Sequence, residues 1–189
     1  MSVNKHDCLG AQSIVKDLFS FIGEDGEREG LKETPLRFLK AWSEWCSGYD
    51  KKPEDVLKCF EDGAEDANEL IVVRNIPIWS HCEHHLAPFF GTADIGYIPN
   101  GKIVGLSKFA RLCDIFARRL QVQERLTNQI ADAINNTLEP IGVGVIVNCR
   151  HLCMESRGVK THNSETITSA LRGALIEQDK ARNEFLSLR

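Results

Sequence analysis

Two helical patterns stand next to each other in the middle of this chain, with strand-like segments on both sides of them. Apolar side chains recur every three or four positions over residues 106–120 and again over 122–138, and Pro140 prevents the second helix from continuing. Segments 70–79, 89–98, 143–154 and 164–171 are rich in β-branched and aromatic residues, as strands are. Two strands, two helices and two strands predict an α+β unit with an antiparallel sheet.

The apolar stripes of the two central helices predict which side chains they bury. Ser107 is placed to cap the first of them. The stripes consist of Phe109, Leu112, Cys113, Phe116, Ala117 and Leu120 in the first helix, and of Val122, Leu126, Ile130, Ile134 and Leu138 in the second.

The residues before the first strand have helical periodicity. One helix is predicted over 7–22, and a second begins where Thr34 can cap it and Pro35 fits the first helical position, and runs toward Gly48. A short charged helix is predicted over 178–188. We therefore expect a helical N-terminal extension, residues 1–68, and a main domain, residues 69–189.

Composition excludes several classes of protein. The content of 42% hydrophobic and 26% charged residues is typical of a folded domain, and there is no apolar run of the roughly 20 residues that a membrane-spanning helix needs. The net charge of −4 argues against nucleic acid as a partner. Seven cysteines, an odd number without a secretion signal, indicate reduced thiols. We expect a cytoplasmic protein with no membrane segment.

Two clusters of metal-ligand residues lie far apart in the sequence. Cys82 and His85 have the C-x-x-H spacing that lets one turn offer a thiolate and an imidazole to the same ion. If the strand 143–154 is regular, Cys149, His151 and Cys153 all point to one face. Should the clusters meet, Cys82, His85 and Cys153 would make a three-ligand zinc site with one position left for water.

Two other interpretations of these clusters remain open. His84 or His151 could be a fourth ligand in a closed structural zinc site, or the thiols could be buried without any metal. The HExxH motif of zinc proteases is absent. His81-Cys82-Glu83 matches half of the nucleobase deaminase signature, but the required P-C-x-x-C does not follow. The other cysteines, Cys8, Cys46, Cys59 and Cys113, are interpreted as packing residues.

Basic side chains are placed to bind an anion. Ser107, Lys108 and Arg111 lie at a predicted helix N-terminus, where free N–H groups and the helix dipole favour negative charge. Arg157 and Lys160 closely follow Cys153, and arginine binds phosphate oxygens in a bidentate manner. Each of these two basic clusters alone is more often part of a solvated surface. Two such clusters together near a metal site indicate that the ligand carries phosphate.

Gln123 and Glu124 open the second central helix. The carboxylate and amide could accept hydrogen bonds from the N–H edge of a guanine-like ring, although acidic residues also favour helix N-termini for the dipole alone.

With these residues noted, the chain resembles the GTP cyclohydrolase I family from about Gly23 to Leu186. The motifs that carry the resemblance are Glu27-Arg28-Glu29-Gly30-Leu31 with Glu33-Thr34-Pro35 and Arg37; Cys82-Glu83-His84-His85; Gly105-Leu106-Ser107-Lys108 with Arg111; Gln121-Val122-Gln123-Glu124-Arg125-Leu126-Thr127; and His151-Leu152-Cys153-Met154 with Arg157-Gly158.

The resemblance implies a tunnelling fold, in which residues 69–189 form the catalytic domain with its helices on one face of the sheet. It implies a homodecamer of two stacked pentamers with active sites at subunit boundaries. The implied reaction converts GTP and water into 7,8-dihydroneopterin triphosphate and formate, the first step of tetrahydrofolate or pterin biosynthesis, with one Zn²⁺ per subunit.

The resemblance also implies residue roles. Zinc is held by Cys82, His85 and Cys153, His84 and His151 move protons, and Glu124 with Gln123 anchors the guanine. The triphosphate and ribose are held by Ser107, Lys108, Arg111 and Arg157, with Arg37 and Lys40 reaching across from a neighbouring subunit. Acidic Glu155 departs from the family pattern between Cys153 and Arg157, and it must point elsewhere if it is not to repel the triphosphate.

Two rival functions are consistent with parts of this pattern. A tunnelling-fold relative that acts on a deazaguanine nitrile would need a reactive cysteine nucleophile and a nicotinamide cofactor. A zinc-braced protein that only binds a pterin or nucleotide would not need His84 and His151. Removal of zinc and substitution of the histidines separate these functions from hydrolysis.

Overall fold

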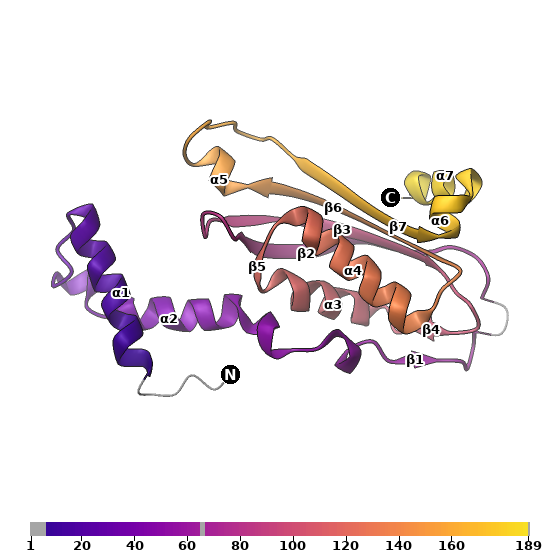
Figure 1. The fold of residues 1–189 in the computed structure, drawn as a ribbon, viewed down its shortest axis with the longest axis horizontal. Helices are drawn as coiled ribbons and strands as arrows, with labels where there is room; N and C mark the ends of the chain where they lie inside the picture. The colour runs from indigo at the N-terminus through magenta and orange to yellow at the C-terminus, as the bar shows by residue number, and fades with distance from the viewer. Residues whose placement is uncertain (1–6, 65–66, 189) are drawn as a thin grey trace.

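The computed structural model describes residues 7–64 and 67–188, with side chains from residue 10 onward. Its main body is an α+β unit built on a five-stranded sheet in the order β5-β2-β3-β6-β7, and a helical extension projects from one end of that sheet (Figure 1). The α-helices are α1 (Asp7–Ile22), α2 (Thr34–Trp45), α3 (Ser107–Ala117), α4 (Gln123–Leu138), α5 (Leu152–Glu155), α6 (Ala174–Glu177) and α7 (Asp179–Leu188). The strands are β1 (Cys59–Phe60), β2 (Ile71–Cys82), β3 (Pro88–Ile98), β4 (Ile103–Val104), β5 (Leu120–Gln121), β6 (Gly142–His151) and β7 (Thr166–Gly173).

The four long strands pair in an antiparallel manner, which confirms the predicted sheet. β2 pairs with β3, β3 with β6, and β6 with β7. Two features were not predicted. β5 adds a parallel pairing of two residues beside His81 and Cys82, and β1 pairs with β4 in a separate two-stranded sheet. The order of elements agrees with the tunnelling fold expected from the sequence.

β2 contains a β-bulge between Val73 and Ile76. Val73 pairs with Ile95 and Ile76 with Ala93, so β2 uses one residue more than β3 over this step. Asn75 lies within the bulge with a positive φ of 57°, and its backbone N–H donates a hydrogen bond to the Asp94 carboxylate. Asparagine adopts this left-handed conformation more readily than most residues. The bulge lets Ile71 and Val73 before it, and Ile78 after it, face the same side of the sheet.

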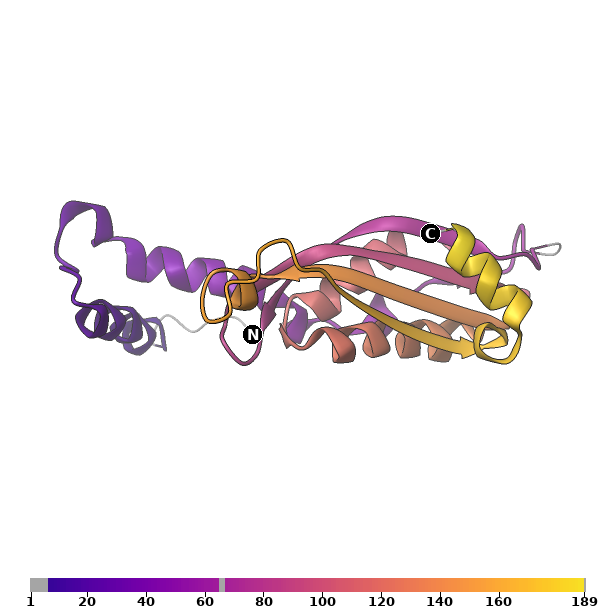
Figure 2. The same ribbon diagram turned by 90° about the horizontal axis from the view of Figure 1, so that it is seen from above.

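Helices α3 and α4 cover one face of the sheet, along which both lie in Figure 2. Their predicted stripes are confirmed: Phe109, Leu112, Leu126 and Ile130 are fully buried in the core between helices and sheet. Burying such a side chain contributes about 1.5–3 kcal/mol, so this face holds the domain together. Leu120 lies outside α3, in β5.

Helix α7 packs on the opposite face, at the end of the sheet remote from the extension (Figures 1 and 2). Its fully buried Phe185 lies against Gly96 and Gly144, which alternate along their strands with the helix-facing Ile95 and Val145. A Cβ at Gly96 or Gly144 would lie within 3 Å of the Phe185 ring. The two glycines therefore form the recess that receives this ring.

The extension consists of α1, α2 and three short 3₁₀ helices, Glu29–Leu31, Ser47–Asp50 and Pro53–Asp55. The predicted helices are confirmed, but neither predicted cap is. The residues at the N-cap positions are Glu33 for α2 and Leu106 for α3, and neither side chain forms a capping hydrogen bond. Thr34 and Ser107 are instead the first residues within the helices. The proposed domain boundary at residue 68 stays a prediction.

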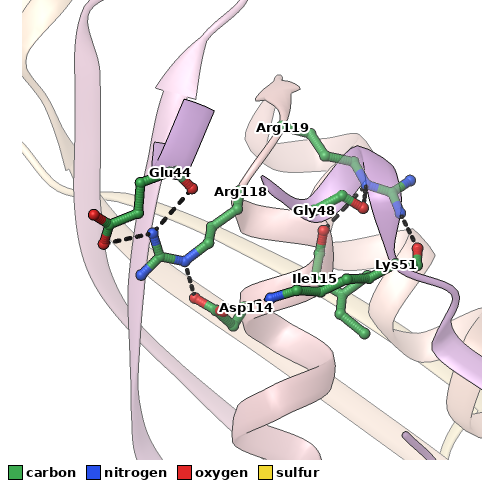
Figure 3. Close-up of polar contacts among 7 residues, drawn as sticks. All are labelled: Glu44, Gly48, Lys51, Asp114, Ile115, Arg118 and Arg119. Atoms are coloured by element: carbon green, nitrogen blue, oxygen red, sulfur yellow. Dashed lines mark hydrogen bonds and ion pairs between the residues drawn. The ribbon is translucent and has the colours of Figure 1, made fainter. Parts of the chain in front are cut away.

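Two arginines at the end of α3 hold the extension against the main domain (Figure 3). Arg119 donates hydrogen bonds to the carbonyl oxygens of Gly48 and Lys51. Arg118 donates to the carbonyl oxygen of Glu44 and pairs with Asp114 on its own helix. Backbone carbonyls accept most of these bonds, so the clamp depends on the path of the chain through residues 44–51 more than on its side chains.

Candidate active site

The end of β2 places Cys82 and His85 in one tight turn. The Cys82 carbonyl oxygen accepts hydrogen bonds from the N–H groups of His85 and Leu86, at 3.3 and 2.8 Å, and the Cys82 N–H donates to the Ala87 carbonyl at 2.8 Å. Leu86 has a positive φ of 55°, which lets the chain reverse into β3. Sγ of Cys82 lies 3.8 Å from Nδ1 of His85. This is about the separation of two ligands on one tetrahedral zinc ion, given bonds of about 2.0–2.3 Å.

Cys153 does not lie on a strand, contrary to the prediction of a strand over 143–154. β6 ends at His151, and the chain turns directly into α5, where the Ser156 N–H donates to the Leu152 carbonyl oxygen. The alternation argument therefore fails for Cys153, although it holds for Cys149 and His151 on β6. The helical turn brings Cys153 to the other cluster by a different route.

Cys82, His85 and Cys153 form a group able to hold a metal ion, with one ligand atom from each lying within 4.8 Å of the others. Burial raises the pKa of the Cys153 thiol, and the adjacent Cys82 sulfur raises it further. Two neighbouring cysteine sulfurs beside an imidazole are a donor set that a divalent cation would stabilise as thiolates. Among the described residues neither His84 nor His151 belongs to this group.

The ligand group opens onto a cavity of about 250 Å³. It is bounded by the turn after β2, the start of α4, the end of β6 and α5. The lining residues are Cys82, His84, His85, Gln121, Val122, Gln123, Glu124, His151, Cys153, Met154 and Thr166. Both predicted proton carriers and both residues predicted to bind the base thus line the cavity that contains the metal-ligand group.

His84 and His151 have different surroundings. His84 is exposed beside Glu83, which also forms an ion pair with Arg125 at 2.5 Å. His151 is partly buried, and its ring stacks on Phe89 with centroids 4.7 Å apart and planes 9° from parallel. Burial lowers the pKa of His151, against a smaller opposing effect of the Glu124 carboxylate. His151 is therefore held inside the fold, whereas His84 is exposed, with its Nδ1 3.8 Å from Sγ of Cys82.

The two residues at the start of α4 also differ. Glu124 is exposed and lines the cavity, where its carboxylate can accept hydrogen bonds from a ligand. Gln123 is 1% exposed, and both ends of its side-chain amide form hydrogen bonds inside the protein. Binding of a base by Gln123 stays a prediction. Both polar atoms of its side chain already have hydrogen-bond partners inside the protein.

The predicted anion-binding residues do not all gather at this cavity within one chain. Arg157 reaches its edge, with a guanidinium nitrogen 3.5 Å from Nε2 of His85. Ser107 and Lys108 lie at the start of α3, whereas β5, beside Cys82, follows the end of that helix. The 11 residues of α3 span about 15 Å, which separates this N-terminus from the metal-ligand group.

Arg111, Arg37 and Lys40 also lie outside the cavity lining. Arg111 lines a different cavity with Lys51, Pro77 and Trp79. Arg37 and Lys40 are exposed on α2 in the extension, where Arg37 pairs with Glu33. Within a single chain, the metal-ligand group and Glu124 therefore share one cavity, whereas most of the residues predicted to bind the triphosphate lie outside it.

Glu155 does not face the cavity. It is 6% exposed and forms two hydrogen bonds with the Arg150 guanidinium, at 2.9 and 2.5 Å, which lower its pKa. This is the orientation that binding of a triphosphate nearby requires. Its negative charge is neutralised within the fold.

Sequence reasoning missed Phe89 and Thr166 as parts of the site. Phe89 pairs with His151 across β3 and β6, and Thr166 accepts from the Gln123 amide. The strand pattern of 89–98 predicts that Phe89 is buried, but only the register between β3 and β6 places its ring against His151. No local sequence signal reports that register.

No helix among the described residues has the length and apolar character needed to cross a membrane.

Comparison with known proteins identifies relatives over nearly the whole chain. A family model described as GTP cyclohydrolase I matches residues 11–189. The chain is 63% identical over 171 residues to GTP cyclohydrolase 1 of Janthinobacterium sp. (strain Marseille), covering 90% of this chain and 86% of the relative. It is 57% identical over 171 residues to GTP cyclohydrolase 1 of Nitrosospira multiformis, covering 90% of each. It is 50% identical over 189 residues to that of Streptomyces avermitilis, covering 99% of this chain and 92% of the relative.

A solved structure of the archaeosine synthase QueF-Like in the apo form superposes on 55% of this chain and 93% of that chain, with a TM-score of 0.42 and 17% identity. The family assignment rests on the sequence matches alone. Their extent and identity establish that this chain belongs to the GTP cyclohydrolase I family.

Proposed function

We propose that this chain hydrolyses GTP to 7,8-dihydroneopterin triphosphate and formate, as the first step of tetrahydrofolate or pterin biosynthesis in the cytoplasm. The observation that carries the proposal is one cavity lined by the Cys82, His85 and Cys153 group, by two further imidazoles and by the Glu124 carboxylate. Membership of the GTP cyclohydrolase I family supports the choice of substrate.

Zinc is the metal that fits the ligand group. Two cysteine sulfurs and one imidazole nitrogen within 4.8 Å suit a small tetrahedral ion with nitrogen and sulfur ligands, and three protein ligands leave one position for substrate or water. A bound zinc ion supplies a Lewis acid that lowers the pKa of water to near neutrality, which hydrolysis of the guanine ring at C8 requires.

The two histidines outside the ligand group suit proton transfer. His84 is exposed at the cavity, so it can approach a ring nitrogen of the substrate that must take up a proton when the C–N bond breaks. His151 is held by Phe89 and Gln123, so it exchanges protons from a fixed position. Histidine is the side chain whose ordinary pKa of about 6.5 permits both steps near neutral pH.

Glu124 suits recognition of the base. Its exposed carboxylate lies on the same cavity as the metal-ligand group, and a carboxylate accepts from the adjacent N–H groups of guanine. We propose that it orients the ring, with Gln123 next to it in the chain.

The triphosphate site is proposed to form between subunits. Ser107, Lys108 and Arg111 lie too far from the metal-ligand group of their own chain, and Arg37 and Lys40 project on the extension. In a homodecamer of two stacked pentamers, a neighbouring subunit would bring these groups to the cavity beside Arg157. The site would then be complete only in the assembly.

The test incubates the full-length protein with GTP and measures formate and the pterin product. Wild-type protein, protein treated with a chelator, and His84→Ala are compared, with zinc content and oligomeric state measured in parallel. We expect turnover to be lost on metal removal and to fall by about 10²–10⁴-fold in His84→Ala at unchanged zinc content. Undiminished turnover after complete metal removal would contradict the zinc mechanism.

A further inference from the structure

The start of α4 carries a buried amide whose hydrogen bonds can be assigned one by one. Nε2 of Gln123 lies 3.0 Å from the Val147 carbonyl oxygen on β6 and 2.8 Å from the Thr166 carbonyl oxygen on β7. It also lies 3.1 Å from Oγ1 of Thr168. The residue is 1% exposed, so water does not compete for these bonds. One side chain thus links a helix to two strands.

The surroundings fix which way the amide points. Backbone carbonyl oxygens only accept hydrogen bonds, so the amide nitrogen, with its two hydrogens, must face Val147 and Thr166. Reversing the amide would set its oxygen against two carbonyl oxygens in a buried place, where the oxygens repel one another and both hydrogen bonds to the carbonyls are lost. The orientation therefore follows from the partners and not from the shape of the amide.

The neighbouring hydroxyls agree with this orientation. Thr127 donates to the Gln123 carbonyl oxygen at 2.8 Å, so the short 2.6 Å contact between the Thr127 and Thr168 hydroxyls is donated by Thr168. Thr168 then turns a lone pair toward the Gln123 nitrogen. In this assignment every hydrogen of the network has an acceptor.

The oxygen of the same amide faces His151. Oε1 of Gln123 lies 2.8 Å from Nε2 of His151, and an amide oxygen only accepts. Nε2 must therefore carry a hydrogen. The Phe89 ring stacked on the imidazole restricts its rotation out of the plane that contains this partner. Among the described residues, Nδ1 of His151 has no hydrogen-bond partner.

We propose that Gln123 is a positioning residue that holds neutral His151 as the tautomer with hydrogen on Nε2, which leaves the lone pair of Nδ1 as the proton acceptor. The tautomer follows from this chain's own hydrogen bonds, whereas the catalytic use of Nδ1 rests on the proposed function. This role differs from direct binding of guanine by the Gln123 side chain.

Solid-state NMR of the full-length, zinc-loaded protein with ¹³C,¹⁵N-labelled histidine tests the tautomer and does not depend on particle size. The spectra are recorded at a pH of about 8, well above the ordinary histidine pKa of about 6.5. The His151 signals are those missing from His151→Asn. We expect Nε2 to be protonated and Nδ1 to be unprotonated. A protonated Nδ1 with a bare Nε2 in the wild type would overturn the proposal.

Two variants separate Gln123 from a general effect of the network. Gln123→Met keeps a similar volume but removes the amide, and we expect His151 to become a mixture of tautomers. Thr127→Val removes a buried hydroxyl from the same network without removing the bond to His151, and we expect the wild-type tautomer. An unchanged tautomer in Gln123→Met, or an equal change in Thr127→Val, would assign the tautomer to something other than Gln123.

Kinetics with GTP separate positioning from binding of the base. We expect Gln123→Met to lower kcat by at least about tenfold, with KM changed by less than about threefold, because a misplaced proton acceptor affects the chemical step. A raised KM with unchanged kcat and tautomer would instead make Gln123 a guanine ligand. If the wild type has the expected tautomer but does not hydrolyse GTP, the proposed function fails and the positioning role stands.

Discussion

The backbone N–H of Gly48 donates a hydrogen bond to the carbonyl oxygen of Arg118 at 3.0 Å, which joins the N-terminal extension to the end of α3. A Cβ at Gly48 would lie 2.1 Å from the Ile115 carbonyl oxygen and 2.7 Å from that of Arg118. The close approach of the two backbones therefore requires glycine at this position.

Gly48→Ala is expected to destabilise the protein by about 1–3 kcal/mol, because the added methyl group forces two backbone segments apart. Chemical denaturation measures the change. Gly10→Ala is the matched control: a Cβ there meets nothing within 4 Å, and alanine favours the helix in which residue 10 lies. Equal stability of Gly48→Ala and the wild type would show that the two backbone segments can separate at this contact without loss of folding free energy.

Cys153→Ser is expected to reduce zinc affinity by more than about 100-fold, which exceeds the loss caused by removing an outer-shell partner of a metal ligand. Elemental analysis and competition with a chelator measure it. Cys46→Ser is the control, since Cys46 ends α2 and lies outside the ligand group. A variant that retains one zinc per chain with wild-type affinity would remove Cys153 from the site.

Complementation between subunits tests the shared triphosphate site. Lys108→Ala and Cys153→Ser are each expected to lose turnover of GTP, one through the phosphates and the other through the metal. Random mixed oligomers of the two inactive variants would hold about one quarter intact sites, because each site draws one part from each of two chains. Co-expressed tagged and untagged subunits, purified as mixed oligomers, give the measurement. No recovery in verified mixed oligomers would indicate that one chain supplies both parts.

Alkylation of cysteines tests the burial of the core thiols. Burial raises the pKa of Cys113 and of Cys149 to about 12. At a pH of about 8.5 their thiolate fraction is below about one in a thousand, so iodoacetamide should leave both unmodified in the folded protein. Modification of both is expected to rise with pH toward 12 and to be immediate in denaturant. Mass spectrometry of each cysteine-containing peptide reports it, and rapid labelling of Cys113 in the native state would contradict the packing.

The helices of the main domain were predictable because their apolar stripes alone determine which face is buried. Leu126, Ile130 and Ile134 lie one helical turn apart and all are buried. Cap positions were not predictable in the same way. Thr34 and Ser107 are good capping residues in principle, but each helix starts one residue earlier than a cap at these positions allows.

The metal-ligand residues were predictable as a set, but the path of the chain that brings them together was not. The β-branched run before Cys149 does predict a strand. Leu152, Met154 and Glu155 are helix formers, a signal that favours the turn at Cys153 over a longer strand. The partners of Gln123 could not be inferred, because they depend on the register of β6 and β7 beneath α4.

The bulge of β2 has a consequence for insertions and deletions. If β2 paired regularly through Asn75, Ile76 and Ile78 would face away from the side that Ile71 and Val73 occupy, so the extra residue is what places the apolar residues of both halves of β2 on one face. Deleting Asn75 would remove the extra residue and leave the pairs on both sides of it in place, so Cys82 would keep its side of the sheet. We therefore expect β2 to accept the loss of one residue at Asn75, whereas one residue gained or lost between Ile76 and Cys82 would exchange the two faces of that part of the strand.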